Sequence, residues 1–104
     1  MSTDHRLSAK EQVENMISML QNDPHRARLQ PIIDECESLS RAIAAFHIEG
    51  IRFRMFNVDR LITKAGLPVP TGCAPTFASV RRELEAAGFH TRSHQAPPTT
   101  TSGT

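Results

Sequence analysis

The feature that most constrains the fold is an apolar stripe at helical spacing near the start of the chain. It occupies residues 9–21, where apolar side chains recur every three or four positions, a period that predicts an amphipathic helix. The stripe consists of Ala9, Val13, Met16, Ile17 and Leu20. Ser8 and Glu11 have the spacing of a capping box, so the helix is predicted to begin just after Ser8.

A second stripe with the same period spans residues 32–46 and predicts a second helix, closed by Gly50. Between the stripes, Asn22-Asp23-Pro24 ends the first helix. Pro31 follows soon after, so residues 24–30 are predicted to form a short turn of helix or a kinked lead-in. Two helices with a short joint favour an antiparallel hairpin over residues 8–50.

The pattern changes after Gly50. Residues 51–56 alternate between apolar and basic side chains, which favours a short strand or an extended connection. Asn57 or Asp59 can cap a third helix that stops at Gly66. The prolines within residues 67–72 require extended or turned backbone there.

A fourth helix is predicted to open at Pro75 and to end at Gly88, with Phe89 packing back on Leu84. Residues 90–94 suit a short strand, and residues 95–104 are poor in apolar side chains and are predicted to be disordered. The predicted fold class is therefore α+β and predominantly helical, in one small domain over residues 1–94. An N-terminal helix pair is followed, over residues 51–94, by a winged-helix-like helix–loop–helix with a short C-terminal strand.

The composition fits a soluble domain rather than a membrane or secreted one. No apolar run among the 104 residues approaches the length of a membrane span, and the N-terminus lacks an apolar signal core, so no membrane partner is expected. Cys36 and Cys73 lie in different segments, which favours free, buried thiols in a reducing compartment. We therefore expect a cytoplasmic protein.

No constellation of residues indicates catalysis, a metal or a cofactor. The chain has five histidines and two cysteines, but no Cys-x-x-Cys pair and no other spacing typical of zinc ligands. Glycine-rich phosphate loops are also missing. The chain alone is not expected to be an enzyme or to hold a cofactor.

The charge distribution favours a polyanionic partner. Residues 1–49 carry five Lys/Arg against eight Asp/Glu, whereas residues 50–94 carry seven against three. Cations held on rigid elements neutralise phosphates, so the basic half predicts an RNA-binding surface. Its candidate residues are Arg60, Lys64, Arg81, Arg82, Arg92 and His94. The bland alternative is a solvated surface. A third interpretation is a helical protein–protein adaptor whose helix pair at 9–49 presents an apolar groove.

Three segments of the C-terminal half resemble a known family. Phe56-Asn57-Val58-Asp59-Arg60-Leu61-Ile62-Thr63-Lys64-Ala65-Gly66-Leu67-Pro68-Val69-Pro70 is similar to an aromatic–Asp–helix–Pro segment in the C-terminal domain of tRNA (guanine-N2)-dimethyltransferases. Val80-Arg81-Arg82-Glu83-Leu84-Glu85-Ala86-Ala87-Gly88-Phe89 resembles that family's Leu-Arg-x-x-Gly-aromatic stretch, and Thr91-Arg92-Ser93-His94 resembles its Ser-Arg-Thr-His.

This resemblance covers residues 53–101, about half of the chain. It implies a stand-alone relative of a tRNA-contacting domain, with Arg92 and His94 as RNA contacts and a separate methyltransferase subunit as a candidate partner. The chain departs from the family in three ways. It is one residue short between Gly88 and Thr91, it lacks the terminal Lys-Thr-Asp-Ala-Pro, and it lacks the methyltransferase domain that would precede this region.

Overall fold

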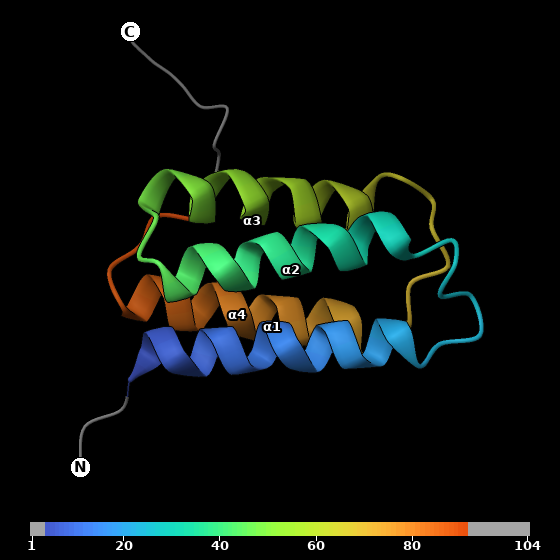
Figure 1. Cartoon of the computed structure of the whole chain (residues 1–104), viewed down its shortest axis with the longest axis horizontal. Helices are drawn as coiled ribbons and strands as arrows, with labels where there is room; N and C mark the ends of the chain where they lie inside the picture. Colours follow the sequence, from blue (N-terminus) through green and yellow to red (C-terminus); the bar gives the residue numbers. More distant parts are fainter. Residues whose placement is uncertain (1–3, 92–104) are drawn as a thin grey trace, which may run out of the picture.

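Four helices build the protein in the computed structural model, which describes residues 4–91 (Figure 1). They are α1 (His5–Gln21), α2 (Gln30–Ala44), α3 (Ile48–Thr63) and α4 (Cys73–Ala86). The residues described contain no strand. The strands of the predicted α+β class are therefore absent from these residues, and its coarser part, a predominantly helical fold, is confirmed.

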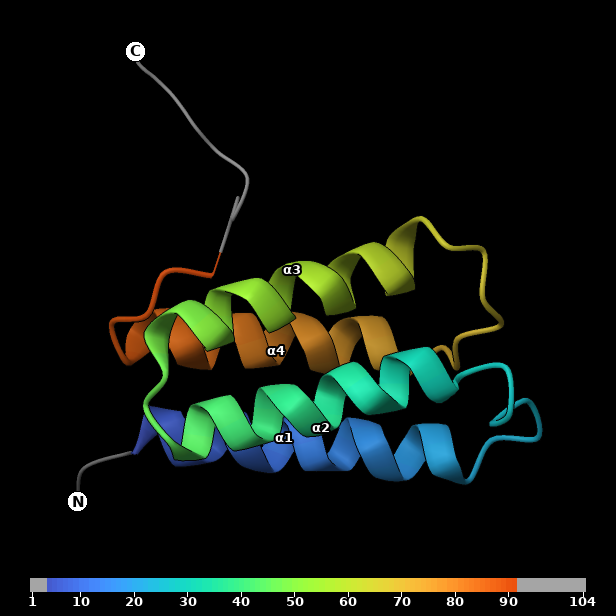
Figure 2. The ribbon, with the colours of Figure 1, turned by 45° about the horizontal axis from the view of Figure 1, so that its top comes forward.

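Consecutive helices run in opposite directions, so the chain passes along the bundle alternately up and down (Figures 1 and 2). α1 packs against both α2 and α4, and α2 packs against α3. The predicted hairpin of the first two helices is thus present, but the winged-helix arrangement is not. In its place, α3 and α4 complete a four-helix bundle, as short connections between antiparallel neighbours allow.

A single apolar core runs through the bundle, and every helix contributes to it. The stripe of α1 is buried at Ala9, Val13, Met16 and Leu20. The other three helices bury Ile32, Ile33, Cys36, Leu39, Ile43, Ile51, Met55, Val58, Cys73, Phe77, Val80 and Leu84. Because none of these stripes can be buried by its own helix, the four helices depend on one another for stability.

The first helix begins one turn earlier than the sequence predicts. Asp4 is its N-cap, and its carboxylate accepts a hydrogen bond from the backbone N–H of Leu7 at 3.1 Å. Ser8 lies inside the helix, so the predicted capping box is wrong. Both Asp and Ser are good caps, and the earlier one lets an additional turn form.

The prediction of a strand or extended connection at residues 51–56 is also wrong, because this segment lies inside α3. Ile51, Met55 and Val58 are buried at helical spacing, whereas Phe53 faces solvent. The alternation in the sequence arose because one apolar residue, Phe53, lies on the outer face. His47 caps α3, and Gly50 belongs to its first turn rather than ending α2.

The end of α4 confirms the prediction for Gly88 and Phe89. Gly88 has a φ of 97°, and its N–H donates to Glu85 O at 3.0 Å. The N–H of Phe89 donates to Leu84 O at 2.9 Å, which completes a Schellman motif. Of the predicted strand at 90–94, the first two residues are not in a strand, and the rest lies outside the described residues, as does the tail at 95–104.

Two helix boundaries also differ from the prediction. Pro31 lies in the first turn of α2 and does not interrupt it, because a helix tolerates proline at this position. α3 ends at Thr63, three residues before Gly66, whose φ is 69°. Within residues 4–91, no helix combines the length and the apolar character that crossing a membrane requires.

Candidate interaction groove between α2 and α3

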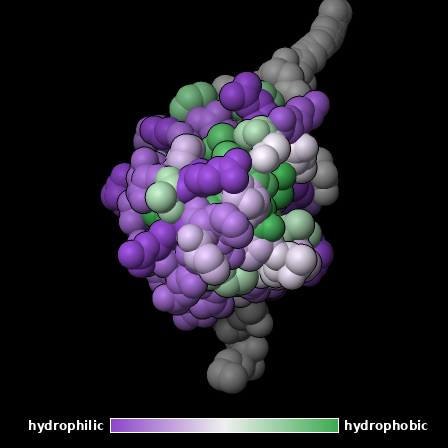
Figure 3. All heavy atoms as spheres, turned by 90° about the vertical axis from the view of Figure 1, so that its right-hand side faces the viewer, coloured by the Kyte–Doolittle hydropathy of each residue, from purple (hydrophilic) through white to green (hydrophobic). Residues whose placement is uncertain are grey.

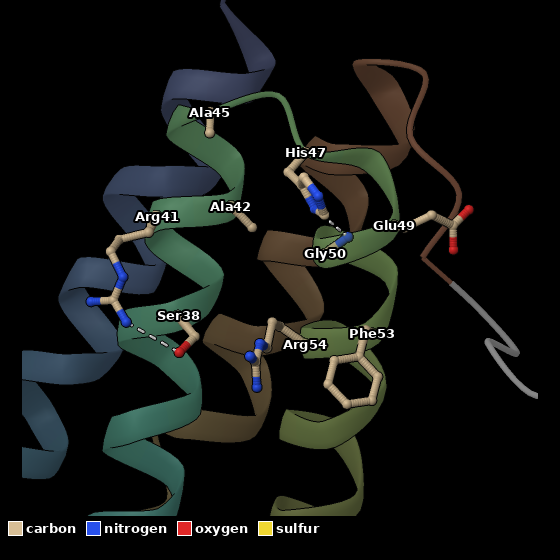
Figure 4. A pocket seen from close by; sticks show the side chains of 9 residues that line it. All are labelled: Ser38, Arg41, Ala42, Ala45, His47, Glu49, Gly50, Phe53 and Arg54. Atoms are coloured by element: carbon tan, nitrogen blue, oxygen red, sulfur yellow. Dashed lines mark hydrogen bonds between the residues drawn. The ribbon is translucent and has the colours of Figure 1, made fainter.

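An open groove of about 560 Å³ lies between the second half of α2 and the first half of α3 (Figure 4). Its lining residues come from these two helices and the turn that joins them. They are Ser38, Arg41, Ala42, Ala45, His47, Glu49, Gly50, Phe53 and Arg54. We call this feature the α2–α3 groove.

Small side chains make the hollow. On α2, Ser38, Ala42 and Ala45 follow one another at a spacing of four and three residues, which places them on one face of the helix. Gly50 faces them from α3. A Cβ added at Gly50 would lie 2.4 Å from His47 Nδ1, so the close approach of the capping imidazole requires glycine here.

The cap at His47 also fixes its hydrogen-bonding roles. Its Nδ1 accepts a hydrogen bond from the backbone N–H of Gly50 at 2.8 Å. Because Nδ1 accepts, the proton of the neutral ring lies on Nε2. His47 therefore offers an N–H donor at the end of the groove.

The wall on α3 is aromatic and basic. Phe53 is 42% exposed, and the guanidinium of Arg54 lies 5.0 Å from its ring centroid. Arg54 Nη1 donates to both carboxylate oxygens of Glu35, at 3.1 and 3.2 Å, and Asn57 Nδ2 donates to Glu35 Oε1 at 3.2 Å. This half-buried cluster joins α3 to α2 and holds the wall in place.

The two outer rims of the groove carry opposite charges. Arg41 extends from α2 and donates to Ser38 Oγ at 3.3 Å. Glu49 extends from the other side of α3, where its carboxylate pairs with Arg52 at 3.2 Å and its side chain is 68% exposed (Figure 4). Such exposed pairs contribute little to stability, so both groups can be recruited by a partner at low cost.

Two further large apolar side chains are exposed at the α2–α3 turn, outside the residues that line the groove. Phe46 and Ile48 are 60% and 56% exposed, and they flank His47 in the chain. The Phe46 ring lies 5.9 Å from that of Phe89, between centroids. The Phe46 ring thus lies against the segment that follows α4.

The RNA-binding residues predicted from the sequence do not form one cluster. Arg60 and Lys64 are both exposed at the far end of α3, where they border a small hollow of about 250 Å³. Arg81 and Arg82 lie in the second half of α4, which runs antiparallel to α3, and so nearer the opposite end of the bundle (Figure 2). Arg92 and His94 lie outside the described residues.

Arg81 has a structural contact that the sequence did not predict. Its Nη1 donates to the backbone oxygen of Thr91 at 2.6 Å and contacts the Thr91 hydroxyl at 3.1 Å. The guanidinium also lies 5.4 Å from the ring centroid of Phe77. Arg81 thus fastens the segment after α4 to the helix, whereas Arg82 is exposed.

Two arginines missed by the sequence analysis lie at the same end of the bundle as Arg60 and Lys64. Arg26 and Arg28 are exposed in the turn between α1 and α2, and this turn lies at the same end as the α3–α4 loop (Figures 1 and 2). Hydrophilic residues predominate on this end, around a smaller apolar area (Figure 3). The only sequence signal was their place in a turn beside Pro24.

The cysteines are not poised for chemistry. Both are buried and free. Burial raises the pKa of the Cys36 thiol to about 12, with smaller contributions from Cys73, Glu35 and Glu37, and burial also raises the pKa of Cys73. Thiols that hold their protons so firmly are poor nucleophiles. Among residues 4–91, no group of three or more His, Cys, Asp or Glu residues is arranged to hold a metal ion.

Comparison of the chain with protein-family models, with curated proteins and with solved structures finds no match.

Proposed function

We propose that the protein is a non-catalytic protein–protein interaction module that receives its partner in the α2–α3 groove. This function corresponds to the protein–protein adaptor considered from the sequence. Its groove, however, lies between α2 and α3 rather than within the helix pair at 9–49. The observation that carries the proposal is the exposed ring of Phe53 beside a hollow lined by the small side chains of Ser38, Ala42 and Ala45.

The composition of the groove suits a protein partner. Aromatic and arginine side chains are enriched at protein interfaces, and Phe53, Arg41 and Arg54 supply both kinds. The floor is apolar, and the rims are charged, which is the usual layout of an interface core and its edge.

Site-specific photocrosslinking tests this proposal. We expect a photoreactive phenylalanine at position 53 to yield a discrete crosslinked protein in cells. The same photoreactive amino acid in place of Glu11, which is exposed on α1, should yield none. Ala45→Trp, which fills the hollow, is expected to abolish the product. Identical products at both positions, or none at position 53, would contradict the proposal.

RNA binding is a second candidate, favoured by the four exposed cations at one end of the bundle. Arg26 and Arg28 come from the loop between α1 and α2, and Arg60 and Lys64 from the end of α3, so they offer phosphate contacts at one end of the bundle. The family resemblance, where it holds, implies tRNA as the ligand and a separate methyltransferase subunit as the protein that this chain would serve. Arg92 and His94 would then add contacts.

A filter-binding titration against tRNA separates this candidate from the first. Phosphate contacts release counterions, so affinity should fall steeply with salt. The variant Arg60→Glu should lower both the affinity and the salt slope, whereas Arg82→Glu, an equal charge change near the other end, should change them less. Equal effects of the two variants, or no binding at low salt, would rule out this site.

A further inference from the structure

We infer that the partner in the α2–α3 groove is a second copy of this chain, related to the first by a two-fold axis parallel to α2 and α3. This inference rests on the proposed function, because it assigns an occupant to the same groove. It is carried by two kinds of complementarity that this face has with itself: a projecting ring beside a hollow, and opposite charges on its two rims.

The levels of the two helices follow from the cluster around Glu35. Arg54 and Asn57 both contact this carboxylate, so Glu35 on α2 lies at a height along the bundle between those of Arg54 and Asn57 on α3. Because α2 and α3 are antiparallel, each step forward on α3 matches a step back on α2. Phe53 is therefore level with Ser38, and Glu49 is level with Arg41.

A two-fold axis parallel to the helices keeps these levels and exchanges the helices. α3 of each copy then lies over α2 of the other. Phe53 of one copy meets the small side chains at Ser38 and Ala42 of its partner, and Glu49 on one rim meets Arg41 on the other. Both pairs occur twice, as an isologous interface requires.

The other face-to-face arrangement fits the surface less well. A two-fold axis perpendicular to the helices would lay α3 on α3 and α2 on α2. With the axis at the level of Glu49 and Arg41, Glu49 would lie beside Glu49 and Arg41 beside Arg41, and each Phe53 ring would lie over α3 of the partner instead of the small side chains of α2. Like charges across an interface disfavour association, so the parallel axis is the arrangement that the charges select.

Sedimentation velocity with charge-reversal variants tests the dimer. We expect the wild-type chain to dimerise, Arg41→Glu and Glu49→Arg each to weaken dimerisation by about tenfold or more, and Arg41→Glu/Glu49→Arg to recover most of it. Glu11→Arg on α1 serves as the matched control and should leave the dimer intact. Circular dichroism verifies that each variant folds.

Three results would overturn the inference: a wild-type chain that stays monomeric up to about 1 mM, single reversals without effect, or a double reversal that adds the two losses. Photocrosslinking at position 53 then distinguishes the two levels of the proposal. A product with a different protein would leave the groove as an interaction site without a dimer. No crosslinked product at all would contradict both the dimer and the groove as an interaction site.

Discussion

The guanidinium of Arg6 lies 4.2 Å from the ring centroid of Phe46, although Phe46 is 60% exposed and has a φ of 57°. Arg6 also donates to the backbone oxygen of Ile43 at 3.0 Å. The first turn of α1 is thereby tied to the end of α2 and to the turn that leads into α3. The backbone of a bulky residue disfavours the left-handed conformation, so the ring contacts of Phe46 hold it there.

Two substitutions at Phe46 separate the ring from the backbone. Phe46→Ala loses the contacts with Arg6 and Phe89 and keeps the strain, so we expect it to destabilise the fold by about 1–2 kcal/mol. Phe46→Gly loses the same contacts but relieves a left-handed cost of about 1 kcal/mol. Urea denaturation should therefore find the glycine variant more stable than the alanine variant. The reverse order would show that the left-handed backbone is not strained.

Gly88 provides a second test of the cost of a left-handed backbone, because glycine has no side-chain contact that a substitution would remove. A Cβ added there meets no atom within 4 Å, so Gly88→Ala is opposed only by the φ of 97°. We expect a loss of about 1 kcal/mol in the free energy of unfolding. Gly88→Asn should cost less, because asparagine tolerates the left-handed region better than alanine. Equal losses for the two variants would contradict a conformational origin.

The cluster around Glu35 is predicted to hold α3 against α2. Glu35→Ala leaves Arg54 and Asn57 without their acceptor, and we expect it to cost about 1–2 kcal/mol, discounted because about a third of Arg54 is exposed. Glu35→Gln keeps an acceptor and should cost less. A double-mutant cycle with Arg54→Ala measures the coupling. A coupling energy near zero would show that apolar packing alone positions the wall of the groove.

The parts of the fold that sequence predicts well are those with one consistent signal. The apolar stripes of α1 and α2 have a clear helical period. Gly88 followed by Phe89 is typical of a Schellman motif and so indicates the end of α4. The first half of α3 was missed because Phe53 lies on its outer face and mimics a strand alternation. The helical spacing of Ile51, Met55 and Val58 was present in the sequence. However, only the packing against α2 shows that the helical period, and not the strand alternation, describes this segment.

The groove was beyond the reach of the sequence for a related reason. Ala42, Ala45 and Gly50 are unremarkable residues until α2 and α3 become neighbours, when their small size leaves a hollow. The charged residues were visible, but their spatial grouping was not. Arg81 is fastened to Thr91, and Lys64 shares an end of the bundle with Arg26 rather than with Arg82.

The buried thiol of Cys36 predicts a loss of stability at high pH. Its pKa rises from an ordinary value of 9.0 to about 12 in the folded protein, chiefly because burial disfavours the thiolate. The unfolded chain therefore releases the proton first, and its release favours unfolding. The contribution of Cys36 is complete below about pH 9, declines by about 1.4 kcal/mol per pH unit above that value, and is lost towards pH 12.

Urea denaturation at several pH values, compared between the wild type and Cys36→Ala, measures this effect. We expect the wild type to lose stability more steeply than the variant as the pH rises above about 9. The remaining slope of the variant includes the raised pKa of Cys73. Alkylation provides an independent measurement, because both thiols should react slowly with iodoacetamide in the folded protein and rapidly in urea. Equal pH slopes in the two proteins, or fast alkylation without urea, would show that Cys36 is open to solvent.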